Sequence, residues 1–371
     1  MGRRIPHKLL MKKKKILCLI DSLGAGGAQR QMVGLASFLK ERGYDVIVAF
    51  YHEELFYADN LLSKGVPYVY LKKAESSLFR IFQISKYIRR IKPDVVISYL
   101  ENPSICACIA RLFNNSFKLI TSERNTTQNT GKEERIRFGF FRLADYVVPN
   151  AFAQADYIHK SFPFLSKKVI TIPNFVDVDY FTPPIVRKRR TIPEVMVAAT
   201  IWPSKNTLGF VNAISQLKDK GYRFHVRWYG KDEANIDYYN ACQQKIDELG
   251  VGEFLELKEK TTQIRDKYQD SDYFCLPSFY EGTPNVICEA MACGLPIACS
   301  NVCDNCRYVA NEENGFVFNP LETSSIVEAM ERMLFLNEKD YASFCSCSRE
   351  KAIKIFSKDR FVDSYIKLIE Q

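Results

Sequence analysis

Residues 278–300 read SFYEGTPNVICEAMACGLPIACS, and this stretch decides the fold. A loop that contains glycine and proline, at residues 282–284, runs into an apolar helical pattern that stops at Gly294. A loop that enters a helix presents free backbone N–H groups, which suit a phosphate. Glu289 is expected about one or two turns inside this helix, where its carboxylate can accept hydrogen bonds from two neighbouring sugar hydroxyls. A phosphate-binding loop together with a carboxylate that binds two hydroxyls is what the binding of a nucleotide-sugar requires.

The same stretch resembles the signature of the retaining glycosyltransferases of the GT-B fold, family 4, which reads approximately S-x-x-E-G-x-P-N-x-x-x-E-A-M-A-x-G-x-P. The resemblance implies that Glu281 is a catalytic residue, which lies beside the donor sugar and stabilises positive charge on it, and that Glu289 holds the ribose of the nucleotide. It also implies donor contacts from the residues that follow Glu281, namely Gly282, Thr283, Pro284, Asn285 and Val286. The simplest alternative is a surface loop and half-buried helix of an unrelated α/β enzyme.

Short apolar runs alternate with helical patterns along the chain, which predicts an α/β fold with doubly wound parallel sheets. The expected strands of the first half cover 15–20, 45–51, 66–71, 94–99, 118–121, 145–149 and 168–172, and its expected helices 28–42, 78–92 and 103–112. The expected strands of the second half cover 194–200, 223–229, 253–257, 273–276, 296–299 and 316–318, and its helices 206–220, 236–249, 284–293 and 323–336. The resemblance implies GT-B architecture, with two Rossmann-like domains facing a cleft.

Domain boundaries follow from composition and from the resemblance. Two prolines, Pro183 and Pro184, precede a basic cluster at 187–190, which is typical of a linker. The expected segments are a basic tail (1–14), an acceptor-side domain (15–178), a linker (179–193), a donor-binding domain (194–356) and a final helix (357–371). The resemblance implies that this final helix crosses back to the first domain.

The net charge of +9 is concentrated at the start of the chain, because residues 1–15 hold seven basic residues and no acidic one. The remainder is nearly neutral, so nucleic acid is not an expected partner. Such a tail can bind anionic lipid, or it can simply keep the start of the chain solvated. The apolar run at 16–20 is too short for a secretion signal, and the 12 cysteines are expected to be reduced. We expect a cytoplasmic protein, peripheral on the inner membrane face if the tail binds lipid.

A glycine-containing loop follows the first expected strand, and it resembles the family's G-G-A-E/Q loop. Gln29 occupies the third glycine position of a dinucleotide-binding motif, so that motif is not matched. Gly26 and Gly27 are therefore candidate contacts to the donor phosphate or to the acceptor. A tight strand-to-helix turn remains the alternative.

Residues 199–206 resemble a G-R-x-x-x-x-K loop of the family whose cations meet the donor diphosphate. Lys205 fits the lysine, whereas Thr200 stands where arginine is usual, so half of the charge clamp is in doubt. Lys205 is also taken as a catalytic residue, with a solvated helix-start lysine as the alternative. Gly230 resembles the family's glycine turn beneath the donor.

Glu123 and Arg124 follow an expected strand, where charged side chains lie at the ligand edge of an α/β sheet. Their sequence, Ser-Glu-Arg-Asn, resembles a segment in bacterial members that attach sugars to lipid-linked acceptors. The sequence leaves two interpretations of this segment, contact with the acceptor or a surface salt bridge. The expected helix 78–92 is basic and amphipathic, with an apolar face that includes Leu78, Ile84 and Ile88, so it either packs on its own sheet or lies on a membrane.

No metal or other cofactor is expected besides the nucleotide-diphosphate sugar as co-substrate. The sequence holds no Asp-x-Asp in a donor loop, since Asp177 and Asp179 fall where the first domain meets the linker. Cys303 and Cys306 have CxxC spacing but lack a second pair of ligands.

The sequence predicts a retaining, metal-independent hexosyltransferase. It would move a sugar from a nucleotide-diphosphate sugar to a hydroxyl of a glycan or polyprenyl-linked oligosaccharide. Such an enzyme would serve surface polysaccharide biosynthesis, such as lipopolysaccharide or capsule. The alternatives are a nucleotide-sugar 2-epimerase of similar fold and a non-enzymatic polyanion-binding protein.

Overall fold

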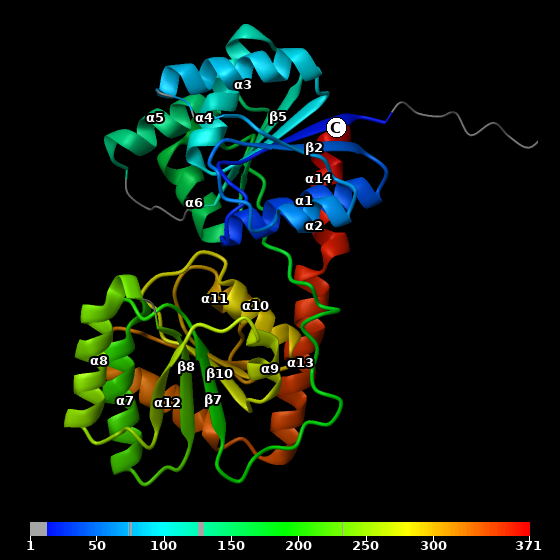
Figure 1. Ribbon diagram of the computed structural model, residues 1–371. Helices are drawn as coiled ribbons and strands as arrows, with labels where there is room; N and C mark the ends of the chain where they lie inside the picture. Colours follow the sequence, from blue (N-terminus) through cyan, green and yellow to red (C-terminus); the bar gives the residue numbers. More distant parts are fainter. Residues whose placement is uncertain (1–12, 73, 75, 125–129, 232) are drawn as a thin grey trace, which may run out of the picture. The chain divides into compact units, whose positions relative to one another are not determined.

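The computed structural model describes residues 13–72, 74, 76–124, 130–231 and 233–371 (Figure 1). Most of the predicted basic tail, residues 1–12, therefore lies outside the described residues. The chain divides into two compact units. The first unit comprises the residues up to Pro149 together with Tyr157–Ile170 and Val362–Gln371, and the second comprises Asn150–Asp156 and Thr171–Phe361.

The first unit is built on a parallel sheet whose strand order is β3-β2-β1-β4-β5-β6. Its strands are β1 (Lys15–Leu19), β2 (Asp45–Phe50), β3 (Tyr68–Tyr70), β4 (Val95–Tyr99), β5 (Lys118–Glu123) and β6 (Tyr146–Pro149). The helices on one face are α3 (Ser77–Ile91), α4 (Glu101–Phe113), α5 (Lys132–Phe141) and α6 (Phe152–Ser161). The helices on the other face are α1 (Gly27–Glu41), α2 (Ala58–Ser63) and α14 (Lys358–Glu370), as Figure 1 shows.

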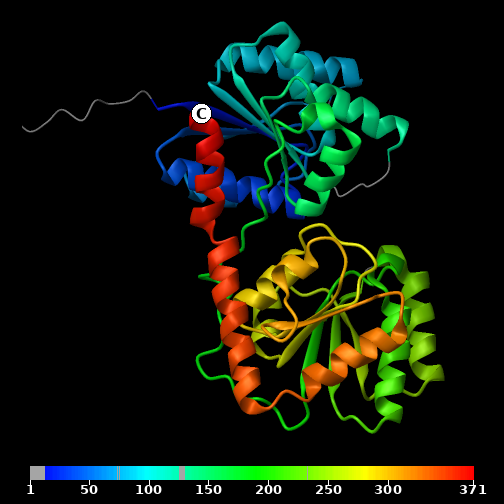
Figure 2. The same ribbon diagram turned by 180° about the vertical axis from the view of Figure 1, so that it is seen from behind.

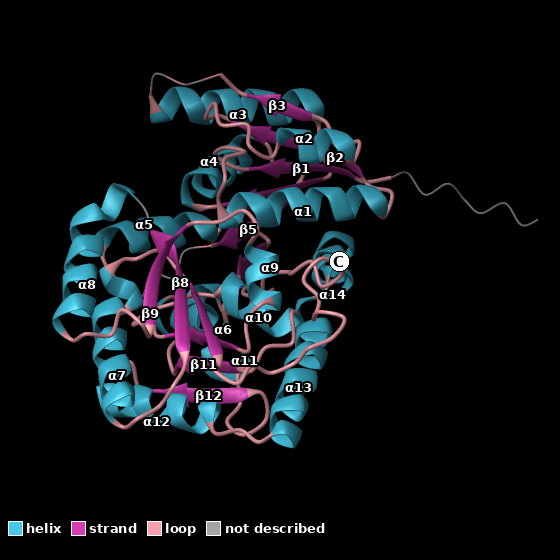
Figure 3. Cartoon of the chain, turned by 60° about the horizontal axis from the view of Figure 1, so that its bottom comes forward, coloured by secondary structure: helices cyan, strands magenta, loops and turns pink. Residues whose placement is uncertain are grey.

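The second unit repeats this plan with the strand order β12-β11-β10-β7-β8-β9. Its strands are β7 (Glu194–Ala198), β8 (His225–Lys231), β9 (Leu255–Glu259), β10 (Tyr273–Leu276), β11 (Ile297–Ser300) and β12 (Gly315–Phe318). One face carries α7 (Thr207–Asp219), α8 (Ile236–Glu248) and α12 (Thr323–Leu334), and the other carries α9 (Ile264–Gln269), α10 (Asn285–Ala292) and α11 (Asn305–Tyr308). The long helix α13 (Glu338–Phe356) contributes to both cores, and Figure 3 shows the strands between the helices.

Strand residues alternate between the two cores of the second unit, because successive side chains of a strand point to opposite faces. In β7, Val195 and Val197 pack under α7 and α12, whereas Met196 and Ala198 pack under α10. All four side chains are buried. A parallel sheet covered on both faces therefore explains the continuous apolar runs of the sequence.

The predicted α/β fold with doubly wound parallel sheets is confirmed, but one predicted strand is wrong. Residues 168–172 form a single isolated bridge, in which the amide of Ile170 donates to the carbonyl of Val147 at 3.0 Å. The neighbouring strand β6 ends at Pro149, which has no N–H to extend the pairing. Several helices were not predicted, namely α2, α5, α6, α9, α11 and α13.

One face of helix α3 packs on its own sheet, which was the first of the two interpretations, and contact with a membrane stays a prediction. Ile84 and Ile88 are buried in the core of the first unit. Leu78, expected on the same face, is instead 79% exposed. None of the described helices combines the length and the apolar character that a bilayer span requires.

The end of the chain belongs to the first unit, where Figure 2 shows α14 beside the sheet. Lys14 pairs with Glu370 at 2.8 Å, and the ammonium group of Lys118 donates to the carbonyl of Leu368 at 3.0 Å. Tyr99 donates its hydroxyl to that of Tyr365 at 2.9 Å. Cations at the last carbonyls of a helix stabilise its end, so residues 362–371 complete this unit.

Each sheet has a point where the chain order reverses, between β1 and β4 in the first unit and between β7 and β10 in the second. The connections that leave these neighbouring strands go to opposite faces, which opens a crevice at the carboxyl ends. In the second unit, the loops at this point are 199–206 and 277–284.

Candidate active site

Lys205 and Glu281 meet at the reversal point of the second sheet. Lys205 follows β7, Glu281 follows β10, and the ammonium nitrogen lies 2.5 Å from Oε1 of the carboxylate. Ser278 donates its hydroxyl to the same oxygen at 2.6 Å. The two charged side chains are only 23% and 11% exposed. The structure thus brings together the two residues that the sequence marks as catalytic.

This pair supplies opposite charges at one position. A partly covered ammonium group can stabilise negative charge that develops on a phosphate, and a fixed carboxylate can stabilise positive charge that develops on a sugar ring. The two loops are also tied together, because the amide of Phe279 donates to the carbonyl of Ser204 at 2.8 Å. The charges are therefore held in place before any ligand arrives.

Gly230 lets the loop 199–206 approach strand β8 closely. A Cβ atom at Gly230 would lie 2.5 Å from the carbonyl carbon of Ala199 and 3.0 Å from the amide nitrogen of Thr200. The close approach allows the amide of Ile201 to donate to the carbonyl of Gly230 at 3.0 Å. Gly230 therefore supports the backbone that carries Thr200 and Lys205.

Gly230→Ala is expected to lower both stability and donor affinity, because the obstructing atoms are backbone and cannot rotate away. Overpacking of this kind costs about 1–3 kcal/mol, which urea unfolding would measure. Gly252→Ala is the matched control, since its Cβ would come no closer than 4.0 Å to Ile246. Equal unfolding free energies for both variants would contradict this role for Gly230.

The loop before α10 is held by two polar contacts within the second unit. Thr283 is buried and donates its hydroxyl to the carbonyl of Asn150. Asn174 donates its side-chain amide to that of Asn285 at 2.9 Å. Asn285 is the first residue of α10, and Pro284 precedes it in an extended conformation. These contacts fix the position of the start of α10. The first N–H groups of a helix have no intrahelical partners, so they are available to a ligand.

Glu289 lies about one turn inside α10, as the sequence predicts, and is only 4% exposed. The hydroxyl of Tyr268, on α9, donates to its Oε2 at 3.1 Å. This contact orients the carboxylate. Sequence reasoning missed Tyr268, because an aromatic residue 21 positions upstream carries no signal of the contact.

In the first unit, Gly26 and Gly27 begin helix α1. Gln29 donates its side-chain amide to Asp21 at 3.0 Å, and Ser22 donates its hydroxyl to Glu54 at 3.1 Å. Carboxylates accept hydrogen bonds from hydroxyls and repel phosphates. The surroundings of this glycine turn are therefore chemically better suited to a sugar hydroxyl than to a diphosphate.

Glu123 and Arg124 are engaged inside the first unit. Glu123 is 2% exposed, and its Oε2 lies 3.6 Å from Nε of the equally buried Arg137. The guanidinium of Arg124 lies 3.8 Å from the ring centroid of Tyr99 and donates to the hydroxyl of Tyr365 at 3.0 Å. A salt bridge was one of the two interpretations of this segment from the sequence. It is present for Glu123, although the pair is buried and not at the surface. Acceptor contact stays a prediction.

The CxxC segment places Cys303 and Cys306 on either side of a buried aspartate. Burial raises the pKa of both thiols. Asp304, between them, is fully buried and accepts hydrogen bonds from the amides of Phe152 and Ala153 at 2.6 and 2.8 Å. Within the described ranges, no group of three or more His, Cys, Asp and Glu residues is arranged to hold a metal ion.

Two family models match the chain, one in each half. Residues 25–180 match the model described as Glycosyltransferase Family 4, and residues 192–335 match that of Glycosyl transferases group 1. The chain belongs to the family 4 glycosyltransferases. Its GT-B fold agrees with the resemblance inferred from the sequence.

The proteins that resemble this chain include bacterial glycosyltransferases. This family 4 glycosyltransferase is 23% identical over 374 residues to the Campylobacter jejuni GalNAc-alpha-(1->4)-GalNAc-alpha-(1->3)-diNAcBac-PP-undecaprenol alpha-1,4-N-acetyl-D-galactosaminyltransferase, covering 96% of this chain and 98% of that one. It is 27% identical over 220 residues to the Escherichia coli UDP-Gal:alpha-D-GlcNAc-diphosphoundecaprenol alpha-1,3-galactosyltransferase, covering 54% and 55% of the two chains.

A solved structure supports the fold. The Anabaena protein HepE in complex with UDP matches with a TM-score of 0.84 and 17% identity, over 96% of this chain and 99% of that one. Membership of the family favours the transferase over the two alternatives from the sequence, an epimerase and a polyanion-binding protein.

Proposed function

We propose that this glycosyltransferase moves a sugar from a nucleotide-diphosphate sugar to a hydroxyl of a polyprenyl-diphosphate-linked glycan. Transfer would retain the anomeric configuration and need no metal ion. The observation that carries the proposal is the contact of 2.5 Å between Lys205 and Glu281 at the carboxyl ends of β7 and β10. The names of the Campylobacter jejuni and Escherichia coli relatives support the acceptor class, since both contain an undecaprenol diphosphate.

The donor would lie along the loops of the second unit. Lys205 and the first N–H groups of α10 would hold the diphosphate, because both present positive charge. Glu289, oriented by Tyr268, would accept hydrogen bonds from the ribose hydroxyls. Gly282 to Val286 would line this site, and Thr200 would add only a hydroxyl where the family usually has a cation.

The chemistry would proceed on one face of the sugar. The bond between the anomeric carbon and the leaving phosphate oxygen breaks, and the acceptor oxygen bonds to the same carbon. The proton of the acceptor hydroxyl passes to the leaving phosphate oxygen, which serves as the base. Glu281 would stabilise the positive charge on the sugar ring, and Lys205 the negative charge on the phosphate.

The acceptor would meet residues of the first unit. Gly26 and Gly27 belong to the turn in which Ser22 and Gln29 donate to the carboxylates of Glu54 and Asp21, and carboxylates suit sugar hydroxyls. Glu123 and Arg124, at the end of β5, are the other candidates for contact with the acceptor. An acceptor with a polyprenyl tail resides in a membrane, so we propose a cytoplasmic protein that works at the inner membrane surface.

Transfer should retain the anomeric configuration of the sugar, and the enzyme should stay active in EDTA. Lys205 and the start of α10 supply the positive charge that a divalent cation would otherwise bring to the diphosphate. NMR of the product of a soluble acceptor analogue would assign its anomeric configuration, with and without chelator. An inverted product would exclude the proposed mechanism, and complete loss in EDTA with rescue by manganese would exclude metal independence.

A further inference from the structure

Three large aromatic side chains are exposed on the two loops that carry Lys205 and Glu281. Trp202 is 48% exposed, and Phe279 and Tyr280 are 41% and 39% exposed. Aromatic side chains contribute a large apolar area when they are covered. Several of them exposed at one place indicate a binding surface, whereas single exposed apolar residues need no explanation.

Local backbone geometry turns these rings outward. Trp202 has an extended backbone, with φ −147° and ψ 149°, so its side chain points away from that of Ile201, which is fully buried. The amide of Phe279 donates to the carbonyl of Ser204 at 2.8 Å, which ties the two loops together. Trp202, Phe279 and Tyr280 therefore lie on one part of the second unit, and they form its aromatic surface.

The aromatic surface lies at the sugar end of the expected donor. In the proposed binding mode, Glu289 holds the ribose, Lys205 the diphosphate and Glu281 the sugar. Trp202 immediately precedes the short helical turn that ends in Lys205, and Tyr280 is next to Glu281. The rings therefore flank the position of the anomeric carbon. The molecule that must approach this position is the acceptor, whose hydroxyl attacks that carbon.

Sugar rings match this surface in chemistry. One face of a pyranose presents mainly C–H groups, which pack against the negative face of an aromatic ring. The charged pair Lys205 and Glu281 lies beside the rings and can exchange hydrogen bonds with hydroxyl groups at the edge of the same sugar. A purely apolar occupant would desolvate these charges without replacing their hydrogen bonds.

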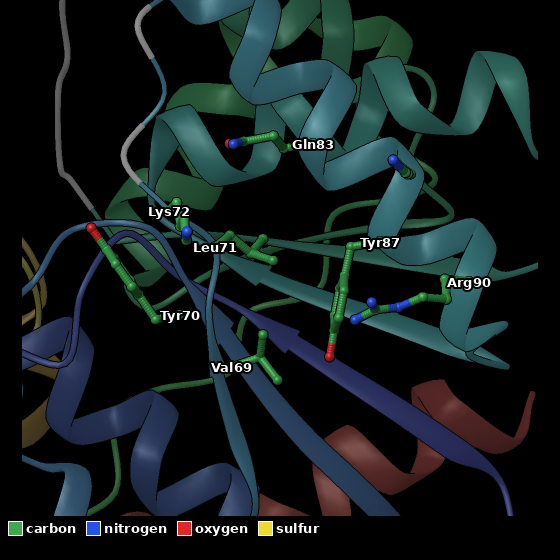
Figure 4. Close-up of a pocket in the computed structure, with 8 residues that line it drawn as sticks. Val69, Tyr70, Leu71, Lys72, Gln83, Tyr87 and Arg90 are labelled. Atoms are coloured by element: carbon green, nitrogen blue, oxygen red, sulfur yellow. The ribbon is translucent and has the colours of Figure 1, made fainter.

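The pocket of about 280 Å³ between β3 and α3 in the first unit offers no such ring (Figure 4). Tyr87 lines this pocket but is only 5% exposed. The guanidinium of Arg90 lies 5.1 Å from the centroid of that ring, and Figure 4 shows Arg90 extended toward it. A ring that is buried and faced by a cation has no free face for a sugar.

We propose that Trp202, Phe279 and Tyr280 form a subsite that stacks on the acceptor sugar next to the one that carries the attacking hydroxyl. The inference rests on the proposed transfer reaction and specifies its substrate. Because the rings lie outside the Lys205–Glu281 pair, they meet a part of the acceptor that does not react. The enzyme should therefore favour an acceptor glycan of two or more sugars over a single sugar.

Tryptophan fluorescence tests the contact, because the chain has two tryptophans and Trp228 is fully buried. Quenching by acrylamide therefore reports on Trp202. The probes are hexose and N-acetylhexosamine trisaccharides on a short alkyl diphosphate, the matching monosaccharides, and the alkyl diphosphate alone, all with saturating nucleoside diphosphate. At least one trisaccharide should lower the quenching about twofold or more, since a covered indole leaves the solvent. Its monosaccharide should not.

Three results of this experiment would overturn the proposal. Protection by nucleoside diphosphate alone would assign the rings to the base. Protection by the alkyl diphosphate without sugar would assign them to the lipid part of the acceptor. Absence of protection by every trisaccharide would leave the rings without a sugar to bind.

Kinetics of single variants test the consequence for the reaction. Trp202→Ser and Phe279→Ser should each raise the KM for the protecting trisaccharide about tenfold, the effect of one lost stacking contact. The KM for the monosaccharide and the donor Kd from calorimetry should stay within about twofold, because neither ligand reaches the rings. Phe335→Ser is the control, since Phe335 of the same unit is 72% exposed and follows α12. It should keep every wild-type constant.

The two proposals fail in different ways. Transfer by wild type with the same trisaccharide KM in all variants would overturn the subsite and leave the reaction intact. A wild-type enzyme that transfers to no acceptor would contradict the reaction, and the quenching experiment would still decide whether the rings bind a glycan.

Discussion

Glu281→Gln is expected to lower kcat by about 10²–10³-fold, the usual effect of removing one fixed electrostatic contact to a transition state. The amide keeps the size of the side chain and can still accept from Ser278, which now donates at 2.6 Å. It removes the negative charge that would face the sugar ring as positive charge develops there. The donor Kd should stay within a few-fold, because this contact strengthens only during the reaction.

The measurement combines steady-state kinetics with calorimetry of donor binding. Glu259→Gln is a suitable control, since Glu259 also pairs with a lysine of the second unit, Lys231, at 2.8 Å, but is 71% exposed. This control should keep wild-type kcat. A Glu281→Gln enzyme with near wild-type kcat would remove Glu281 from the mechanism, whereas a large loss of donor affinity would make it a binding residue.

Lys205→Ala should weaken the binding of free nucleoside diphosphate about 10–150-fold, the equivalent of one charge-assisted hydrogen bond. Thr200 cannot compensate, because a hydroxyl carries no charge. Binding of the free nucleoside should hardly change, since we assign the ribose to Glu289. Turnover should also fall, because the same ammonium group would stabilise the leaving phosphate.

Titration calorimetry with the nucleoside, the nucleoside diphosphate and the nucleotide-sugar would resolve these contributions. Lys231→Ala is the matched variant, because Lys231 ends β8 in the same sheet and is 28% exposed, close to the 23% of Lys205. If Lys231→Ala weakens diphosphate binding and Lys205→Ala does not, the phosphate clamp lies at Lys231.

Hydrophobic periodicity and motif spacing were enough to predict most of the fold and the centre of the candidate site. Lys205 and Glu281 are 76 residues apart, yet both lie in loops that follow strands that become neighbours in a doubly wound sheet. Any α/β arrangement of this kind places them together, so sequence reasoning could pair them in the same site. The family pattern then assigned their expected roles.

Contacts that depend on tertiary packing could not be predicted. The hydrogen bond from Tyr268 to Glu289 joins two short helices, and α9 is too short for periodicity to reveal. The exposure of Leu78 was not predicted either, because only the packed structure shows which apolar residues of α3 reach the core.

Residues 362–371 bear on the order in which the protein folds as well as on how the first unit is held together. The first unit contains the start of the chain, yet Lys14, Tyr99 and Lys118 each contact α14. During synthesis, domains usually fold in order from the N-terminus. Here the contacts with α14 cannot form until residues 171–361 have been synthesised. The whole sequence of the second unit is therefore available before the last contacts of the first unit can form.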